Sequence, residues 1–381
     1  MVEVKKKIKV SLFVHDLSQN SIVRVYPIAK ALQNLNYDVE ILGLTYNTDK
    51  IYEPYENEFE YKTIRSYLDI RWVIINGKKL ADLATGDIVY AFKPLWDSFY
   101  PALLYSKLGL RRQLILDAED NELWNSIRSE KFNLFSNKYF PFSTFFNKLL
   151  HSFTFLVKKK TVVCSNLQKR YGGKIILHGP DANKFNPSNY PSSNFLRGKY
   201  NVPKDCPLII FAGKPVFYNG LDKIVDALLY PQTFNWHLIL AGDSQNSWFK
   251  GAKEMLGERC HLLGYVPNSN MPEIIKMCDI APIIQKPCPE SEFQIPAKML
   301  EAIAMGKGII ATDVSDLKYI LGSDNGWIIP HNDSLFFADL LYSLENDKSE
   351  LKRRGENARK YFLKSASIDN IAYNLKNLFK K

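Results

Sequence analysis

The sequence predicts an α/β fold with two doubly wound parallel sheets, and three observations support this. The chain has 381 residues, which is too long for one ordinary hydrophobic core and suits two domains. Short apolar runs alternate with amphipathic stretches of helical length, a pattern typical of βα units in a parallel sheet. The alternation pauses once, at a segment rich in Asn, Pro and Ser, and then restarts.

The first half of the chain supplies the elements of the first sheet. Apolar runs predict its strands, and apolar residues at helical spacing predict its helices. In chain order we expect a strand at 8–14, a helix at 21–36, strands at 38–44 and 86–92, a helix at 101–109 and a strand at 112–118. The stretch NPSNYPSSN, residues 186–194, has the composition of a linker.

The second half repeats the pattern and ends in an amphipathic helix at 366–381 that needs a surface to pack on. We expect strands at 207–213, 237–243, 259–266, 279–284, 308–312 and 326–330, and helices at 220–230, 271–278 and 296–306. The pattern therefore predicts two Rossmann-like domains that face each other across a cleft. Their expected bounds are 1–185 and 204–364, with residues 365–381 packing back on the first domain.

Positive charge is concentrated in one segment. The formal net charge is +10, and residues 131–180 contain nine Lys or Arg and no Asp or Glu. The five cysteines are scattered without disulfide or metal-ligand spacing, which argues against a disulfide framework and a zinc site. The first residues lead into a predicted strand and do not form a signal peptide, so we expect a cytoplasmic protein.

Two segments of the second domain have the features of a phosphate site. In doubly wound sheets, ligands bind beyond the carboxyl ends of the strands. In FAGKPVFYNGLDKIV a strand ends near Gly213, Lys214 follows, and a helix begins near Gly220. Amides at the start of that helix, together with Lys214, would receive a phosphate. The alternative is that Lys214 is a solvated loop residue.

The second segment is ESEFQIPAKMLEAIAMGKGII, residues 290–310. Pro296 suits the first turn of a helix that has Lys298 and Glu301 on one face. The helix dipole disfavours a lysine there, and a bound diphosphate would reverse the effect. Glu301 can accept hydrogen bonds from a ribose, although a plain surface pair with Lys298 is the alternative. The loop amides that would face the diphosphate belong to Phe293, Gln294 and Ile295.

The run FQIPAKMLEAIAMGKGII resembles the nucleotide-sugar signature of GT-B glycosyltransferases of family four, and FAGKPVFYNGLDKIVDAL, LILAGD and LGYVP follow the family's order. The resemblance implies that Glu301 holds the ribose of a nucleoside diphosphate sugar and that Lys214 touches the diphosphate. It places the base beside Gly264, Tyr265 and Val266. It also implies a retaining reaction with no required metal and no cofactor besides the donor.

Two positions depart from the family's pattern. The family often has two glutamates separated by seven residues, and the position eight before Glu301 is Phe293. Glu292 is one residue off, which leaves its contact with the donor sugar open. Where the family commonly has a second basic residue before the helix glycine, this chain has Asn219 followed by Gly220.

In the first domain, VHDLSQNSIVRVYPIAKAL places polar side chains around the turn after the first strand. Relatives in family four usually have glycines in this turn, and this chain has none. Arg24, one turn into the following helix, is our candidate for a second diphosphate contact that stabilises the leaving group. The alternative is a solvated helix residue.

A cluster of carboxylates follows another strand of this domain. The stretch LDAEDNELW brings four acidic side chains to the end of the strand, on the side of the predicted cleft. Crowding raises the pKa of at least one of them and can create a proton acceptor for an incoming hydroxyl. We expect Asp120 or Glu119 in that role, against the alternative of solvated loop acids.

Residues 131–160 combine eight phenylalanines and a tyrosine with lysines. A helix after Pro141 would place Phe142, Phe145 and Phe146 on one side, which suits an anionic membrane interface. A core helix with solvated lysines is one alternative. Single-stranded nucleic acid is another, but no RNA-binding signature accompanies the segment, so we expect no nucleic-acid partner.

Together these features predict a glycosyltransferase on the cytoplasmic face of a membrane. It would move a sugar from a nucleoside diphosphate sugar to a hydroxyl of a membrane-held acceptor such as a lipid-linked glycan. Two rival hypotheses are a catalytically silent GT-B scaffold that binds a glycan or a partner, and a nucleotide-sugar epimerase that needs no acceptor.

Overall fold

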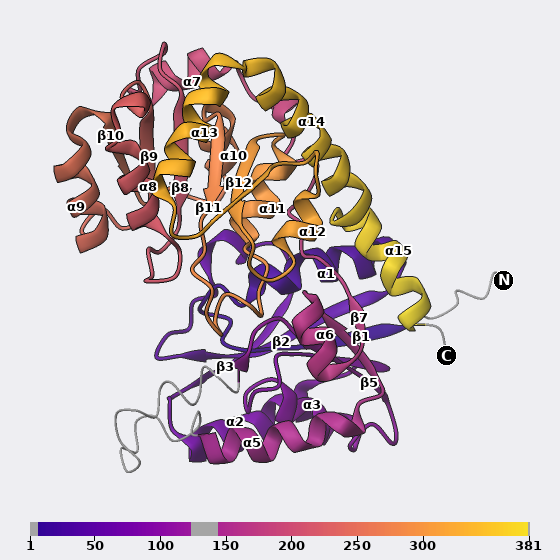
Figure 1. The fold of residues 1–381 in the computed structure, drawn as a ribbon. Coiled ribbons are helices and arrows are strands. Elements are labelled where there is room, and N and C mark those ends of the chain that lie inside the picture. The colour runs from indigo at the N-terminus through magenta and orange to yellow at the C-terminus, as the bar shows by residue number, and fades with distance from the viewer. Residues whose placement is uncertain (1–6, 123–143, 380–381) are drawn as a thin grey trace. The chain divides into compact units, whose positions relative to one another are not determined.

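The computed structural model describes residues 7–122 and 144–379 (Figure 1). The chain divides into two compact units, Met1–His178 with Ile368–Lys381, and Gly179–Ser367. Residues 186–194, which have the composition of a linker, lie inside the second unit. They include the 3-10 helix η5 (Pro187–Asn189) and the start of helix α7 (Ser193–Lys199).

The first unit is built on a seven-stranded parallel sheet in the order β3-β2-β1-β4-β5-β6-β7. Its strands are β1 (Lys9–Val14), β2 (Asp38–Tyr46), β3 (Tyr61–Ser66), β4 (Ile88–Phe92), β5 (Gln113–Ala118), β6 (Lys159–Val162) and β7 (Lys174–Ile175). Its helices are α1 (Ile22–Asn34), α2 (Ile70–Leu83), α3 (Phe99–Ser106), α5 (Thr144–Ser152), α6 (Ser165–Tyr171) and α15 (Ile368–Phe379), with the 3-10 helices η1 (Glu53–Tyr55) and η4 (Phe153–Leu156).

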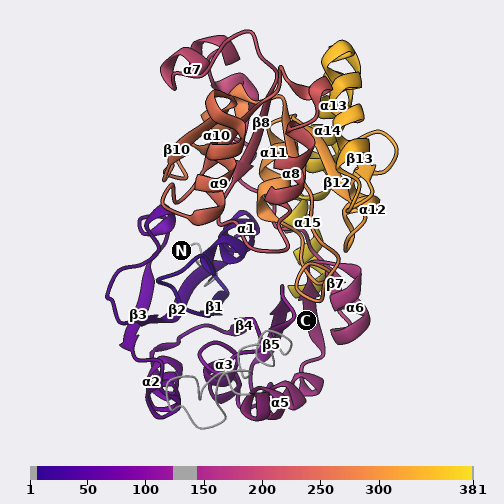
Figure 2. The same ribbon diagram turned by 60° about the vertical axis from the view of Figure 1, so that its left-hand side comes forward.

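Helices cover both faces of this sheet, as Figures 1 and 2 show. On one face, α1 buries an apolar stripe that includes Ile22, Val25 and Ile28, spaced as a helix requires. Helix α15 joins the same core, where the Phe379 ring lies 5.3 Å from that of Tyr37. The other face carries α2, α3 and α5. The predicted packing of the C-terminal helix on the first domain is therefore confirmed.

The second unit is built on a six-stranded parallel sheet in the order β10-β9-β8-β11-β12-β13. Its strands are β8 (Leu208–Ala212), β9 (His237–Ala241), β10 (Cys260–Gly264), β11 (Ile280–Ile283), β12 (Gly308–Thr312) and β13 (Trp327–Ile329). Besides α7, its helices are α8 (Leu221–Leu228), α9 (Ser247–Leu256), α10 (Met271–Met277), α11 (Ala297–Ala304), α12 (Leu317–Leu321), α13 (Ser334–Asn346) and α14 (Lys348–Ser365), with the 3-10 helices η6 (Pro231–Thr233) and η7 (Gly257–Arg259).

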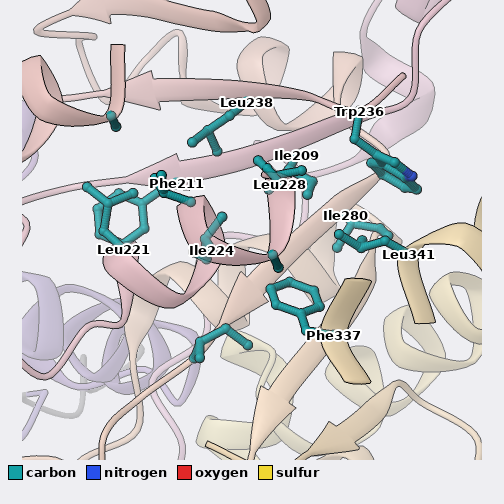
Figure 3. Close-up of a cluster of buried hydrophobic side chains, with 14 of the residues drawn as sticks. Ile209, Phe211, Leu221, Ile224, Leu228, Trp236, Leu238, Ile280, Phe337 and Leu341 are labelled. Carbon is teal, nitrogen blue, oxygen red and sulfur yellow. The ribbon is translucent and has the colours of Figure 1, made fainter. Parts of the chain in front are cut away.

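Alternate residues of β8 show the two covered faces of this sheet. Ile209 and Phe211 belong to the core with α8, α9 and α13 (Figure 3). Ile210 and Ala212 instead lie with residues of α10 and α11, because successive side chains of a strand point to opposite faces. The predicted fold class, two doubly wound parallel sheets, is confirmed. Within the described ranges, no helix is long and apolar enough to cross a bilayer.

Candidate functional site

The second sheet reverses its winding between β8 and β11, which are neighbours although β9 and β10 separate them in the chain. At such a reversal, the loops that leave the two strands diverge and a ligand can bind at the carboxyl edge. Lys214 follows β8, and the segment with Lys298 and Glu301 follows β11. The structure therefore brings both predicted phosphate segments to one edge of one sheet.

The loops after β8 and β11 touch each other. The amide of Lys286 donates to the carbonyl of Tyr218 at 2.9 Å. Gly220, which precedes α8, has a φ of 65°, and a Cβ at this position would collide with the carbonyl oxygen of Ile284. Glycine is thus needed for the left-handed backbone and for the close approach of the two loops.

Asn219 has a structural role in the loop after β8. Its Nδ2 donates to the carbonyl of Lys214 at 3.2 Å, and its amide donates to the carbonyl of Val216 at 2.9 Å. These bonds fold the loop at the start of α8 and leave the Lys214 side chain exposed. The Asn219 side chain is thus used within the loop, and a donor contact by Lys214 stays a prediction.

Lys298 and Glu301 lie near the start of α11, where Pro296 is the N-cap residue. Among the residues described, neither has an ion-pair partner, so the alternative of a Lys298–Glu301 surface pair is not seen. The Lys298 ammonium lies 4.2 Å from the centre of the Phe211 ring. Burial lowers the pKa of Lys298 to about 8. Burial also raises the pKa of Glu301 to about 7, although the positive charge of Lys184 acts to lower it. Both groups are held where their charged forms are disfavoured.

The segment between β11 and α11 is anchored by Glu292. Its Oε2 accepts a hydrogen bond from the amide of Ser315 at 3.1 Å, which ties this segment to the loop after β12. Phe293 and Gln294 are partly exposed, while Ile295 is buried. The bond to Ser315 assigns Glu292 a loop-holding role and leaves a donor-sugar contact as a prediction.

Glycines end three neighbouring strands at the same edge. Gly213, Gly242 and Gly264 follow or end β8, β9 and β10, and all have positive φ. The amide of Gly213 donates to Ala241, and that of Gly242 to Gly264, each at 2.9 Å. The result is a strip of backbone without side chains. The predicted base-binding residues Tyr265 and Val266 follow Gly264 at one end of this strip, and Tyr265 is exposed.

In the first unit, Arg24 is a core residue. Its Nε and Nη2 donate to the two carboxylate oxygens of Asp117 at 3.0 and 2.7 Å, and its Nη1 donates to the carbonyl of Ile176 at 2.6 Å. Both partners of the ion pair are buried. The expectation of a diphosphate contact does not fit this geometry, because Arg24 already neutralises a buried aspartate. A solvated helix residue does not fit it either.

The carboxylate cluster after β5 surrounds Lys93, a residue that no sequence motif singles out. The Lys93 ammonium lies 3.1 Å from Glu119, 2.7 Å from Asp120 and 2.9 Å from Glu122. Burial lowers the pKa of Lys93, but the three acids outweigh it and hold that pKa well above its usual value. Burial raises the pKa of Glu119 although Lys93 opposes the rise, so this carboxyl can hold or release a proton near neutral pH.

A histidine–aspartate pair lies at the same edge of the first sheet. Nδ1 of His15 is 2.7 Å from Oδ2 of the buried Asp97, and the Tyr46 hydroxyl donates to the same oxygen at 2.9 Å. Burial lowers the pKa of His15, but Asp97 outweighs burial and the pKa is raised. Spacing along the chain does not indicate this pairing, because 82 positions separate the two residues.

Residues 131–143 of the basic aromatic segment, including Phe142, lie outside the described residues, as do the side chains of Phe145 and Phe146. The rest of α5 has one buried and one exposed side. Leu150 is buried in the core of the first unit, whereas Leu149 and Lys148 are exposed. Across the described ranges, no group of three or more His, Cys, Asp or Glu is placed to hold a metal ion.

Comparisons with known proteins find relatives for both the sequence and the fold. The chain is 28% identical over 192 residues to a D-inositol 3-phosphate glycosyltransferase of Xylanimonas cellulosilytica, covering 49% of this chain and 46% of that protein. It is 22% identical over 232 residues to a putative glycosyltransferase, EpsD, of Bacillus subtilis, covering 59% and 60%. The chain thus spans about half the length of these relatives.

A solved structure extends the likeness of fold to the whole chain. The structure of HepE from Anabaena in complex with UDP-glucose aligns with a TM-score of 0.72 at 15% identity, over 97% of this chain and 98% of that one. The family model described as glycosyl transferases group 1 matches residues 192–361, which lie within the second unit. The second unit therefore has the sequence pattern of the glycosyl transferases group 1 family, and the two parallel sheets of the chain have the GT-B fold.

Proposed function

We propose that this protein is a glycosyltransferase that takes a sugar from a nucleoside diphosphate sugar and gives it to a hydroxyl of a membrane-held acceptor. One observation carries the proposal. At the carboxyl ends of β8 and β11, Lys298 and Glu301 are held in a partly buried position, and neither has an ion-pair partner among the described residues. A ligand with a diphosphate and a ribose would satisfy both groups.

The chemistry follows from charge that develops on the leaving group. When the bond between the sugar and the diphosphate breaks, negative charge grows on the diphosphate, and cations placed beforehand lower the energy of that state. Lys214 and Lys298 supply these cations in our proposal, helped by amides of residues 293–295. Glu301 accepts hydrogen bonds from the ribose hydroxyls and orients the donor. The likeness to a D-inositol 3-phosphate glycosyltransferase and to a structure that holds UDP-glucose supports this donor class.

The acceptor side of the reaction is proposed for the first unit. The acceptor hydroxyl must lose a proton, and Glu119 is our candidate to receive it because burial raises its pKa. Asp120 is the second candidate, because its carboxylate lies closer to the Lys93 ammonium, at 2.7 Å, than that of Glu119, at 3.1 Å. Arg24 is no longer proposed as a catalytic group, since it is paired with Asp117 in the core.

The exposed side of α2 supports a membrane-held acceptor. This helix exposes Trp72, Ile74 and Ile75, 45%, 37% and 46% accessible, beside exposed Arg71, Lys78 and Lys79. A helix that combines rings, branched aliphatic side chains and cations binds the interface of an anionic bilayer. Leu149 in α5 and Phe155 in η4 are further exposed apolar side chains of the same unit.

Donor binding is the first test. We expect calorimetry with UDP- and GDP-sugars to show binding of one of them. We expect Glu301→Ala to weaken it by about 1 to 3 kcal/mol, the cost of a lost hydrogen bond in a partly buried site. Glu254→Ala, which changes an exposed glutamate of α9, is the matched control. Unchanged donor affinity in Glu301→Ala would show that the pocket is misplaced.

Product analysis separates the rival functions. A glycosyltransferase releases the nucleotide and labels the lipid fraction when a membrane extract is added. Conversion of the donor sugar without any acceptor would instead identify an epimerase, and absence of donor binding would identify a silent scaffold.

Membrane binding is tested on α2. The variant with Trp72→Ser and Ile75→Ser should bind phosphatidylglycerol vesicles at least about tenfold more weakly, because two apolar side chains no longer enter the interface. Leu110→Ser, which changes a leucine that is 87% exposed elsewhere in the first unit, is the control. Equal vesicle binding by the α2 variant and the control would contradict the membrane surface.

A further inference from the structure

A large pocket lies at the edge of the second sheet opposite the proposed donor site. Its volume is about 710 Å³, within the range of small-molecule sites. Its wall includes the residues that immediately precede four strands, namely Pro207, Trp236, Asp279 and Lys307. The residues proposed to bind the sugar donor follow the carboxyl ends of β8 and β11. The length of a strand, roughly 13 to 17 Å, therefore separates this pocket from the proposed donor site. Nothing in the proposed transfer reaction uses this pocket.

The lining of the pocket is cationic. Five basic and three acidic side chains line it, an excess of two positive charges. Lys204, Lys307 and Lys348 have no ion-pair partner among the residues that the structure describes. Lys352 has only Glu356, at 3.9 Å. The pocket therefore presents three ammonium groups that form no ion pair within the described part of the chain.

The fifth cation, Arg197, builds the frame of the pocket. Its Nη2 lies 2.9 Å from Oδ2 of Asp279, and its other nitrogens donate to the carbonyls of Met277, Lys204 and Cys206. Asp279 also accepts a hydrogen bond from the amide of Leu208 at 2.8 Å. Because these bonds use both partners, the Arg197–Asp279 pair fixes the wall and leaves the lysines to meet a ligand.

Lys307 lies between two glycines that bring α14 against the pocket. A Cβ on Gly308 would collide with the side chain of Leu351, and one on Gly355 would collide with the carbonyl of Gly306. The Lys307 ammonium donates to a single carbonyl, that of Lys276, at 2.7 Å. Burial lowers the pKa of Lys307 to about 8, and a bound anion would relieve that cost.

Trp236 adds an apolar wall. Its side chain is almost fully buried, and its Nε1 has no hydrogen-bond partner within the described part of the chain. Figure 3 shows the indole at the margin of the core cluster, with its nitrogen turned away from the labelled aliphatic side chains. Leu344 and Leu351 extend this apolar surface. A ligand with a ring beside its charged groups would contact both kinds of wall.

We propose that this pocket is a second ligand site, which binds a small phosphorylated molecule that carries at least two negative charges. The phosphate groups contact Lys307 in the wall and Lys204 and Lys348 at the mouth. The site is distinct from the donor site at the carboxyl edge, and it does not depend on the proposed transferase activity.

Cys206 provides a local probe of this site. It lines the pocket and is partly exposed, whereas Cys288, the other partly exposed cysteine, follows β11 near the opposite edge. We would alkylate the protein with iodoacetamide at increasing concentrations of inorganic pyrophosphate, at constant ionic strength, and measure both sites by mass spectrometry. We expect pyrophosphate to decrease the alkylation rate of Cys206 at least threefold and in a saturable way. The pyrophosphate concentration at half of this decrease should differ from that of any decrease at Cys288.

Two single variants of α14 make the test specific. Lys348→Ser should raise the pyrophosphate midpoint at Cys206 at least fivefold, since it removes a charge from the mouth of the pocket. Lys360→Ser removes the same charge from an exposed position of the same helix outside the pocket and should leave the midpoint unchanged. Failure of pyrophosphate to protect Cys206, or equal midpoints in both variants, would overturn the proposal.

Discussion

Replacing Glu301 by glutamine should stabilise the protein and weaken donor binding at the same time. Burial raises the pKa of Glu301 from 4.5 to about 7, so the folded protein holds a proton that the unfolded chain releases between these values. Because the folded state binds more protons in this window, its stability falls as the pH rises through it. Glutamine has nearly the same shape and no charge, so it removes this cost.

The magnitude follows from the two pKa values. From these values, proton linkage predicts that Glu301 lowers the free energy of unfolding by about 1 kcal/mol near pH 5.5 and by at most about 3 kcal/mol near pH 8. The variant should therefore gain little at the lower pH and most at the higher one. A glutamate kept in place at such a cost is consistent with a ligand-binding role, because a bound ribose would donate hydrogen bonds to its charged form.

Urea unfolding of the wild type and Glu301→Gln at a series of pH values measures this difference directly. Calorimetry with the sugar nucleotide that the wild type binds tests whether Glu301→Gln also weakens donor binding. The same pair of measurements on Glu254→Gln, in an exposed part of α9, provides the control. A Glu301→Gln variant that is less stable than the wild type, by an amount that does not change with pH, would refute the reasoning.

Three further predictions concern residues on which the fold or the site depends. Between about pH 8 and pH 10.5 the unfolded chain still holds the Lys298 proton that the folded protein has released, so the stability of the wild type should rise with pH. Lys298→Met should remove this rise, which denaturant unfolding at several pH values would measure. Arg24→Met should lower the free energy of unfolding, measured in urea, by about 3 to 5 kcal/mol, because it leaves the Asp117 carboxylate buried without its ion-pair partner. Normal stability with weaker donor binding would instead support a contact between Arg24 and the diphosphate. Gly220→Ala should lower the melting temperature and the donor affinity together, since the new Cβ meets the backbone at Ile284; normal values of both would mean that the loops can separate freely.

The sheet architecture was predictable because it depends on local patterns. The central strands, such as β1, β8 and β9, are buried on both faces and appear in the sequence as continuous apolar runs. Edge strand β3, YKTIRS, is mostly part-exposed and polar, and α14 buries only Gly355, Ala358 and Phe362 along 18 residues. Elements with so little buried surface leave a weak periodicity, and apolar spacing alone does not predict them.

The candidate site was predictable only where its residues lie in one motif. Lys298 and Glu301 share a helix, and Lys214 follows a recognisable strand, so the rule about carboxyl ends was enough to place them on one edge. The pairings of Arg24 with Asp117 and of Lys93 with three acids join residues that are far apart in the chain. Burial and pairing of this kind depend on tertiary contacts, and spacing along the chain does not encode them.

The position of α15 has a consequence for biosynthesis. This helix completes the core of the first unit, where it contributes Leu375 and Phe379, yet the ribosome makes it after the whole of Gly179–Ser367. At ~5 to 20 residues per second, translation of that insertion takes on the order of 10 to 40 s. Throughout this interval the nascent first unit has an uncovered apolar layer over α1, which makes it a candidate client for chaperones during translation.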